Sequence, residues 1–456
     1  MVCVTGVVML MNSDGDASAS ASGTATEADP YSGRSGRQTM LLVVLTLAAM
    51  LGALDRQIMQ LLLLPIKSDL GLTDTQVSQL YGLAFSLSNV LFLLPAGLMA
   101  DRVNRRRLLV AGIAAWSLLT GACGFALSYA SMFAARAGVG IGESVIQPTG
   151  VSMLRSAIPP ERRGRAFAIY AMAIMLGTAL ALLGGGLLLG LIGRGLLVGV
   201  PLLGDLHPWQ AVLLILGTLG LPIMLLVSLV SEPGRPSELK GASYSDALRF
   251  IAGRKGVFFP LAIFNTAAGM LTLGFAAWVV PVLVRRWGLT IPEVGTRLGV
   301  MMLVLPPLGL FATGWLIDMT KRRFGLSGPM LLGAILLLAN IVVHVFAPIY
   351  PTLAGTWVLL ALIMLLGTTC IPIANTMVAA IAPANLIGRI SSLQYMLYGV
   401  FGGGLSATAI AMVSDGFFTG PAAIAHALSI MCGVYGSIGA IGALATAWQL
   451  RPPSSS

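Results

Sequence analysis

Charged residues are scarce in this sequence. Asp, Glu, Lys and Arg together make up 10% of its 456 residues, whereas about 25% is usual in a soluble domain. Hydrophobic residues account for 57%, and the mean hydropathy is +0.90. The apolar runs are about 20 residues long, as membrane-crossing helices require, and are not the alternating segments of about ten residues that form a barrel. The composition therefore excludes a soluble fold and predicts an all-α membrane protein with many spans.

Cysteine is also rare, and the four cysteines form no CxxC pair. Three of them lie in apolar runs, so we expect buried, inert thiols and neither a disulfide framework nor a metal site. The sequence has no nucleotide-binding loop, and the glycine pattern from Gly138 to Gly142 lies in an apolar run and follows no strand. We therefore expect no metal, no cofactor and no enzymatic activity. Any work that the protein performs must draw on an ion gradient or on the gradient of its own substrate.

The apolar runs predict twelve spans. Their expected bounds are 40–65, 76–99, 108–129, 132–156, 166–191, 208–231, 257–284, 294–316, 327–347, 352–380, 387–413 and 422–449. A polar stretch divides them into six and six and ends in an amphipathic pattern, which we interpret as a helix on the membrane surface. The predicted units are a disordered cytoplasmic tail (1–38), a first half (39–231), a cytoplasmic linker with the amphipathic helix (232–256), a second half (257–450) and a cytoplasmic tail (451–456).

Positive charge is distributed unevenly over the expected loops. Nineteen Lys and Arg residues lie on the side that carries both termini and the linker, and five lie on the other side. Because cytoplasmic loops are enriched in Lys and Arg, both termini are predicted to be cytoplasmic. The same distribution accounts for the net charge of +10 without a nucleic-acid partner.

Two sequence patterns repeat between the halves. GLMADRVNRRR after the second span matches GWLIDMTKRR after the eighth, so that Asp101 and Asp318 are equivalent at a separation of 217. PPERRGR before the fifth span matches PANLIGR before the eleventh, which pairs Pro159 with Pro383 at a separation of 224. Two parallel six-span halves, related by an axis along the membrane normal, are one architecture of secondary transporters.

Four charged residues lie well inside the expected spans. Arg136 and Glu143 are two helical turns apart in the fourth span, so they share one face, and the glycines between them allow a neighbouring helix to approach closely. Asp55 and Arg56 are neighbours in the first span and must point about 100° apart. We expect Asp55 to meet Arg136 or to lie near Glu143, with Arg56 turned to another partner. Because a charge at membrane depth costs at least about 2.5 kcal/mol, we predict that these residues are functional and that both carboxylates face one central cavity.

Uncharged polar residues inside the spans could line this cavity, although hydrogen bonding between helices would explain each of them equally well. They are Tyr81, Asn89, Gln147, Tyr170, Asn265, Asn375, Gln394 and Tyr398. The second half contributes no charge at mid-depth, so we expect a cavity that is charged on one wall and apolar on the other. At the cytoplasmic helix ends the repeated pattern predicts a conformational latch. Its residues are Asp101, Arg102, Arg105, Asp318 and Arg322.

The pattern G-x-x-x-D-R-x-x-R-R-R that begins at Gly97 resembles the signature loop of the major facilitator superfamily, and its second copy strengthens the resemblance. Three stretches resemble the Spinster branch of that superfamily: LDRQIMQLLLLPIKSDLGLTDTQVSQLYGLAF at 54–85, RAGVGIGES at 136–144 and PPERRGRAFAIYAMAIMLG at 159–177. Spinster proteins are thought to move lipids such as lysophospholipids or sphingoid phosphates. The resemblance implies that Asp55 and Glu143 couple transport to protons and that Arg56 and Arg136 serve as ion-pair or substrate residues.

Two features depart from the family patterns. Asn104 replaces the glycine that is usual in the signature loop, and we expect the turn to survive because Asn tolerates left-handed backbone angles. The fifth span has GTALALLGGG and lacks the glycine-proline pair typical of drug/proton antiporters, which argues against drug efflux.

We therefore predict twelve transmembrane helices in two pseudo-symmetric halves with the major facilitator fold. The predicted function is proton-coupled secondary transport, by alternating access, of an amphiphilic or anionic lipid-like solute of the lysophospholipid or sphingoid type. The alternative is a proton symporter of small organic anions, which the two arginines could bind equally well; a multidrug exporter and a non-transporting membrane receptor are less favoured. We expect a monomer in the bacterial inner membrane. Its expected partners are the solute, protons and the lipid bilayer.

Overall fold

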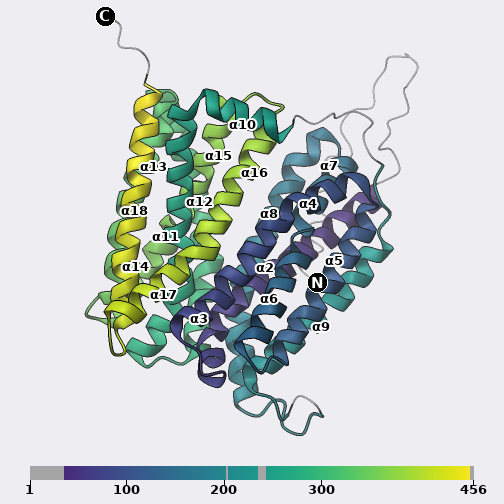
Figure 1. Ribbon diagram of the computed structural model, residues 1–456. Helices are drawn as coiled ribbons and strands as arrows, with labels where there is room; N and C mark the ends of the chain where they lie inside the picture. Colours follow the sequence, from purple (N-terminus) through teal and green to yellow (C-terminus); the bar gives the residue numbers. More distant parts are fainter. Residues whose placement is uncertain (1–34, 202–203, 235–242, 452–456) are drawn as a thin grey trace, which may run out of the picture.

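The computed structural model describes residues 35–201, 204–234 and 243–451, and every regular element in these ranges is helical. The predicted N-terminal tail lies outside the described residues except for its last four, which begin the first helix. Of the predicted C-terminal tail only Arg451 is described, and the linker is described without residues 235–242. Figure 1 shows two groups of helices side by side, the first half in purple to teal and the second half in green to yellow.

The first half comprises α2 (Ser35–Asp69), α3 (Asp74–Ser78), the π-helical turn η1 (Gln79–Leu83), α4 (Ala84–Arg102), α5 (Arg105–Gly124), α6 (Tyr129–Glu143), α7 (Ile146–Ala157), α8 (Pro160–Gly193) and α9 (Pro208–Leu229). The short helix α10 (Tyr244–Gly253) follows in the linker. The second half comprises α11 (Lys255–Trp287), α12 (Ile291–Phe324), α13 (Ser327–Phe346), the 3-10 turn η2 (Ala347–Ile349), α14 (Leu353–Leu366), α15 (Cys370–Ile381), α16 (Ile387–Leu397), the π-helical segment η3 (Tyr398–Leu405), α17 (Ser406–Phe417) and α18 (Ala423–Gln449).

Within the described residues, eleven helices are long and apolar enough to cross a membrane. They coincide with eleven of the twelve predicted spans, which confirms the all-helical membrane fold; one of them, Leu353–Ile381, is interrupted between α14 and α15. The twelfth, predicted at 132–156, is divided between α6 and α7 by a turn at Ser144 and Val145, so neither piece reaches spanning length alone. The expectation of a continuous fourth span is therefore corrected.

Proline accounts for this break. Pro148 has no N–H to donate to the carbonyl of Ser144 one turn earlier, and its ring would clash with that carbonyl in a regular helix. At the turn, the Ser144 hydroxyl donates to the carbonyl of Ile141 (2.7 Å). A second break separates α14 from α15 at residues 367–369, where Pro372 follows Thr368 at the same spacing. Pro148 and Pro372 are 224 residues apart, so the two halves repeat the break as well as the sequence pattern.

The two halves meet closely in the part of the bundle away from α10 (Figure 1). Between α8 and α12, a β-carbon on Gly299 would lie 2.5 Å from the backbone nitrogen of Leu183. Between η1 and η3, a β-carbon on Gly82 would lie 2.5 Å from the carbonyl oxygen of Gly403. Any side chain at either glycine would push the halves apart, so glycine sets the closeness of this interface.

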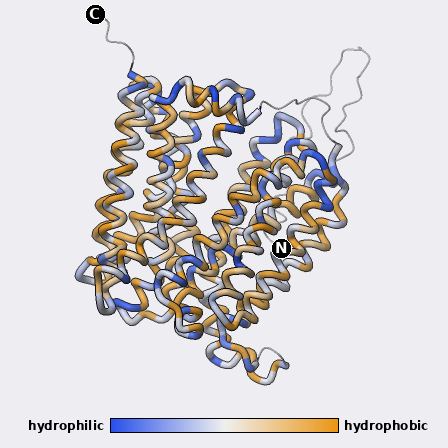
Figure 2. Tube along the Cα trace, in the orientation of Figure 1, coloured by the Kyte–Doolittle hydropathy of each residue, from blue (hydrophilic) through white to orange (hydrophobic). Residues whose placement is uncertain are grey.

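Helix α10 packs against one end of the second half. The Tyr244 hydroxyl lies 3.2 Å from the Ser392 hydroxyl of α16, and the Phe250 ring lies 5.7 Å from the Phe258 ring of α11. Ala247 of α10 is fully buried. Figure 2 shows hydrophilic residues gathered on α10 and at the helix ends beside it, while hydrophobic residues cover the lengths of the helices.

Candidate functional site

Two ion pairs connect α2 with α6 inside the first half. In the first pair, Asp55 lies 3.7 Å from Arg136, and both side chains are buried. Asp55 also accepts a hydrogen bond from the Thr120 hydroxyl of α5 (3.1 Å). The Arg136 guanidinium lies over the Phe85 ring of α4, 5.3 Å from its centroid. Four helices thus enclose this pair and separate it from solvent.

The second pair joins Arg56 to Glu143 and is more accessible. The Arg56 guanidinium donates a hydrogen bond to the Glu143 carboxylate. The Glu143 side chain is 2% exposed, whereas that of Arg56 is 41% exposed. Both residues line a recess of about 40 Å³, which is enough for water or a small polar group. The other residues of the recess are Ala49, Gly52, Asn89, Leu93, Ser144, Ile146, Gln147, Tyr170 and Ile174.

Glycines allow the helices to come this close. A β-carbon on Gly52 of α2 would lie 2.9 Å from Glu143 Oε1, so a larger residue there would require the carboxylate to shift. On α6, a β-carbon on Gly140 would lie 2.5 Å from the carbonyl oxygen of Phe85, and one on Gly142 would lie 2.8 Å from the backbone nitrogen of Trp116. The expected role of the α6 glycines is confirmed, whereas the importance of Gly52 was missed.

Three of the four charged residues, Asp55, Arg136 and Glu143, have buried polar atoms that take part in no hydrogen bond within the part of the chain that the structure describes. Among the described residues, no partner hydrogen bonds with Asp55 Oδ2, with Nε and Nη1 of Arg136, or with Glu143 Oε2. Leaving a buried polar group unpaired costs about 1–3 kcal/mol. Glu143 Oε2 and Arg136 Nε, which lie outside the two ion-pair contacts, can therefore take up a proton or bind a water molecule or an anionic group.

The pairing agrees with the expectation that Asp55 meets Arg136 and that Arg56 turns to another partner. The expectation that both carboxylates face one cavity is not met in this state. Glu143 lines the recess, whereas Asp55 is fully buried behind it. The reason is the direction of neighbouring side chains on α2, because Asp55 and Arg56 must face different sides of that helix.

Three of the four uncharged cavity candidates of the first half line the recess, and one does not. Asn89, Gln147 and Tyr170 line the recess with the Arg56–Glu143 pair. The Asn89 amide also donates to the carbonyl of Gly140 (3.0 Å), so it joins α4 to α6. Tyr81 is not among the lining residues.

The candidates of the second half do not line this recess. Asn265 and Gln394 are buried, and the Asn375 amide donates to the Tyr395 hydroxyl (2.8 Å). Tyr398 packs against α11, where its ring would lie 2.6 Å from a β-carbon on Gly269. An opposite, apolar wall of the cavity therefore stays a prediction.

The second half repeats the helix break without the charges. The Thr272 hydroxyl of α11 donates to the carbonyl of Gly367 at the second break (3.3 Å). Gly367 follows Glu143 at the separation of 224 that relates the two breaks, and Thr272 follows Asp55 at the separation of 217. The second half therefore has the uncharged Thr272–Gly367 hydrogen bond at the positions equivalent to the titratable residues Asp55 and Glu143 of the first half.

The two copies of the predicted latch differ in structure. In the first copy α4 ends at Arg102, and the buried Arg105 begins α5. Its guanidinium donates to Glu232 of the linker (3.3 Å) and to the Ser156 hydroxyl of α7 (2.9 Å). Asp101 and Arg102 are exposed. The first copy therefore ties the start of the linker to α5 and α7.

Asn104 does not adopt the left-handed conformation that was expected for it. Its φ is −61°, and its side chain caps α5 by accepting the backbone N–H of Arg107 (2.8 Å). An N-cap is a position where Asn is preferred over most residues. Asn104 therefore supports the turn between α4 and α5 as the N-cap of α5, without a positive φ.

In the second copy, α12 continues without a break to Phe324. Asp318 and Arg322 are exposed on its last turns, and in the part of the chain that the structure describes neither forms an ion pair. The structure therefore does not bring the two copies of the latch together.

A cluster that the sequence did not predict joins the halves away from α10. Asp74 of α3 accepts two hydrogen bonds from Arg285 of α11, both 2.6 Å long, and a third from Lys67 of α2. Nearby, the Thr75 hydroxyl donates to Asp415 of α17 (2.7 Å). Asp74 and Arg285 are 211 residues apart, and each reads as an ordinary loop charge, so no local signal could have paired them.

The Major Facilitator Superfamily model matches residues 45–407, which is most of the chain. Curated relatives match shorter parts. The cephamycin export protein CmcT of Amycolatopsis lactamdurans is 29% identical over 250 residues, which cover 54% of this chain and 44% of that protein. The probable L-galactonate transporter of Escherichia coli (strain K12) is 31% identical over 97 residues, 21% of each chain. The chain thus spans less than half the length of these curated relatives.

Solved structures cover nearly the whole chain. A bacterial homologue of the human lysosomal transporter Spinster, in an inward-facing and unoccupied conformation, has a TM-score of 0.78 at 23% identity and covers 92% of this chain and 99% of that one. The nucleoside transporter NupG has a TM-score of 0.68 at 14% identity and covers 90% of this chain and 98% of that one. At these identities the likeness shows the fold.

Proposed function

The chain belongs to the major facilitator superfamily of transporters, and on this premise we propose that it is a proton-coupled secondary transporter of an amphiphilic, anionic solute. The observation that carries the proposal is the Arg56–Glu143 pair at the recess, in which an accessible cation holds a buried carboxylate. A guanidinium binds carboxylate and phosphate groups in a bidentate manner. A buried carboxylate that loses its cation is costly to keep charged.

These two properties suggest an exchange reaction. The anionic group of the solute takes over Arg56, and Glu143 then accepts a proton in place of its lost partner. Binding of the solute and binding of the proton are thereby linked at one ion pair. Departure of the solute restores the Arg56–Glu143 contact and returns the proton.

Asp55 and Arg136 form the second part of the proposed coupling site. Because this pair is enclosed, Asp55 can exchange a proton only after α2 and α6 have moved relative to each other. Neighbouring carboxylates titrate as a coupled pair, so the state of Glu143 influences that of Asp55. In this proposal Glu143 responds to the solute first, and Asp55 responds to the conformational change.

The proposed cycle is alternating access. The close glycine contacts and the Asp74–Arg285 pair hold the halves together away from α10. If α10 is cytoplasmic, as the loop charges predict, the described state is inward-facing. The predicted latch residues Asp101, Arg102, Arg105, Asp318 and Arg322 would then come into play when the cytoplasmic side closes.

The class of solute is supported by the distribution of charge. The site offers one accessible cation in the first half and no charge at mid-depth in the second half, which suits a molecule with an anionic head and an apolar body. A small organic anion is the alternative, since Arg56 would bind its carboxylate equally well, and a relative is named as an L-galactonate transporter.

The test is transport by the purified protein in proteoliposomes that contain a pH-sensitive dye. The panel comprises lysophospholipids, a sphingoid phosphate, mono- and dicarboxylates and two cationic drugs. We expect a lipid-like anion to move together with protons, and Glu143→Gln to remove the proton movement. The matched control is Glu161→Gln, an exposed carboxylate in the first turn of α8, which should behave as wild type. Wild-type pH dependence in Glu143→Gln would contradict the coupling mechanism, and movement of carboxylates alone would favour the alternative solute.

A further inference from the structure

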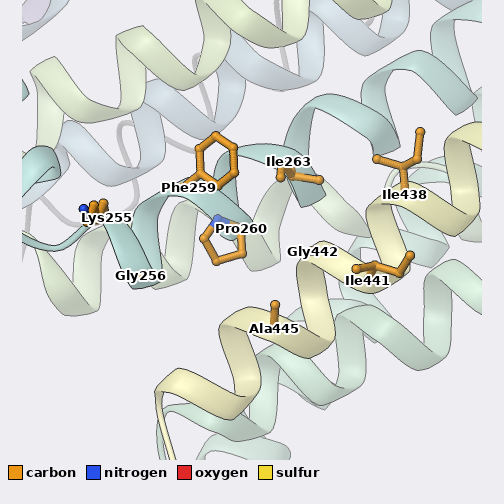
Figure 3. Close-up of a pocket in the computed structure, with 9 residues that line it drawn as sticks. All are labelled: Lys255, Gly256, Phe259, Pro260, Ile263, Ile438, Ile441, Gly442 and Ala445. Carbon is orange, nitrogen blue, oxygen red and sulfur yellow. The ribbon is translucent and has the colours of Figure 1, made fainter.

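An apolar groove lies between α11 and α18 on the outer face of the second half (Figure 3). Its volume is about 580 Å³, within the range of about 300–1,000 Å³ that is usual for small-molecule sites. On α11 it extends from Lys255 to Ile263, a length of about 12 Å at 1.5 Å per residue. The groove is formed by the second half alone and is separate from the Arg56–Glu143 recess.

Small residues form the floor of the groove, and large apolar residues form its rims. At the floor, Gly442 of α18 crosses α11 so closely that a β-carbon would lie 2.7 Å from the carbonyl oxygen of Pro260. Ala445 lies one turn further along α18. At the rims, Phe259 is 68% exposed and Ile441 is 67% exposed. Apolar side chains this exposed on a membrane-spanning helix face the hydrocarbon of the bilayer.

Positive charge gathers at one end of the groove only. Lys255 is exposed at the first residue of α11 and lines the groove. The Gln449 side chain would lie 3.5 Å from a β-carbon on Gly256, and the exposed Arg451 follows two residues later. Neither Lys255 nor Arg451 forms an ion pair within the described part of the chain. The remaining lining is apolar, so the groove has one cationic end and one hydrocarbon-like end.

We propose that this groove binds an acyl chain of an anionic phospholipid, whose phosphate lies against Lys255 and Arg451. The groove begins at the end of α11 next to α10 and runs about 12 Å inwards, which fits within one leaflet of a hydrocarbon core about 30 Å thick. The ligand is therefore a bilayer lipid of the leaflet on the α10 side. The proposal does not depend on the solute that the protein transports.

The test uses the full chain in detergent with equal amounts of phosphatidylglycerol and phosphatidylcholine of identical chains. Native mass spectrometry should show preferential retention of phosphatidylglycerol. Lys255→Gln and Arg451→Gln should each lower that preference about fivefold, the contribution of one cation near an anionic headgroup. Ala445→Trp, which fills the groove, should reduce retention of both lipids. The matched control Ile335→Trp, at a 64% exposed position of α13, should leave retention unchanged.

Photocrosslinking of the wild-type chain tests the proposal without depending on whether a variant folds. Phosphatidylglycerol with a diazirine in its acyl chain should crosslink to residues 255–263 and 438–451. Inorganic phosphate should not displace it, since the acyl chain provides part of the binding. Equal retention of the two lipids, crosslinks spread evenly over the helices, or displacement by phosphate would each overturn the proposal.

Discussion

At the scale of single residues, Asp55 and Glu143 are both buried carboxylates whose cationic partners differ in access to solvent. Arg136 is 1% exposed, whereas the Arg56 side chain is 41% exposed. Water can therefore solvate Arg56 when its carboxylate is removed, but it cannot solvate Arg136. The two carboxylates should consequently respond differently to neutralisation.

Asp55→Asn is expected to destabilise the protein, because it leaves a buried guanidinium without its counter-charge, a loss of about 3–5 kcal/mol in buried pairs. Glu143→Gln should change the stability little. Thermal unfolding of both variants in the same detergent would measure this, with Glu161→Gln as the control. Equal lowering of the melting temperature by Asp55→Asn and Glu143→Gln would show that the two pairs do not differ in this way.

Gly52→Ala tests the approach of α2 to α6. Its β-carbon would lie 2.9 Å from Glu143 Oε1, so the carboxylate must move away from Arg56 while the protein still folds. We expect slower proton-coupled transport with a nearly unchanged melting temperature. The control is Gly184→Ala in α8, where a β-carbon would have no atom within 4 Å. The prediction fails if both alanine variants transport at the same rate.

The charged residues of the site can be identified from the sequence, but their contacts can be predicted only in part. Membrane depth singles out Asp55, Arg56, Arg136 and Glu143, because charges inside apolar runs are rare. Helical geometry separates Asp55 from Arg56. It does not place Thr120 on Asp55 or Gly52 against Glu143, since these contacts depend on how three helices pack. A threonine or a glycine in an apolar run has many ordinary explanations.

At the scale of helices, the Asp74–Arg285 contact ties α3 of the first half to α11 of the second. Its two hydrogen bonds are charge-assisted and bidentate. Asp74→Asn should weaken this tie and increase the fraction of molecules in which the halves separate on that side. Double electron–electron resonance between spin labels on the α8–α9 and α17–α18 connections would detect longer distances. Asp246→Asn on α10 is the control, and an unchanged distance distribution in Asp74→Asn would rule out a role for this pair in closure.

The sequence predicts the ends of helices well where an apolar run ends in charged residues or glycine. It predicts breaks inside an apolar run less well. The division of the fourth span illustrates the difference. Its hydropathy is continuous, but Pro148 removes the hydrogen bond that would join α6 to α7. Other prolines in these spans, such as Pro95 of α4, lie inside unbroken helices. Proline therefore marks a possible break, and packing decides whether the break forms.

At the scale of the whole molecule, the loop charges predict that both termini and α10 lie in the cytoplasm. The measurement is cysteine accessibility in intact cells, using single cysteines in otherwise cysteine-free protein. A cysteine at Ser245 of α10 should react only after the membrane is permeabilised, and one at Gly199 between α8 and α9 should react from outside. The reverse pattern would invert the topology and make the described state outward-facing.

The helix break that both halves share, with titratable groups beside it in the first half and the neutral Thr272–Gly367 contact in the second, has a consequence for how such a protein evolves. Under the proposed mechanism, substitutions beside the break in the first half would alter proton coupling. Substitutions in the second half would alter the predicted apolar wall of the cavity and leave the coupling residues unchanged. Related transporters that share an energy source should therefore diverge in cargo mainly through their second halves, and chimaeras that exchange residues 257–450 should inherit the cargo preference of the donor and the proton dependence of the recipient.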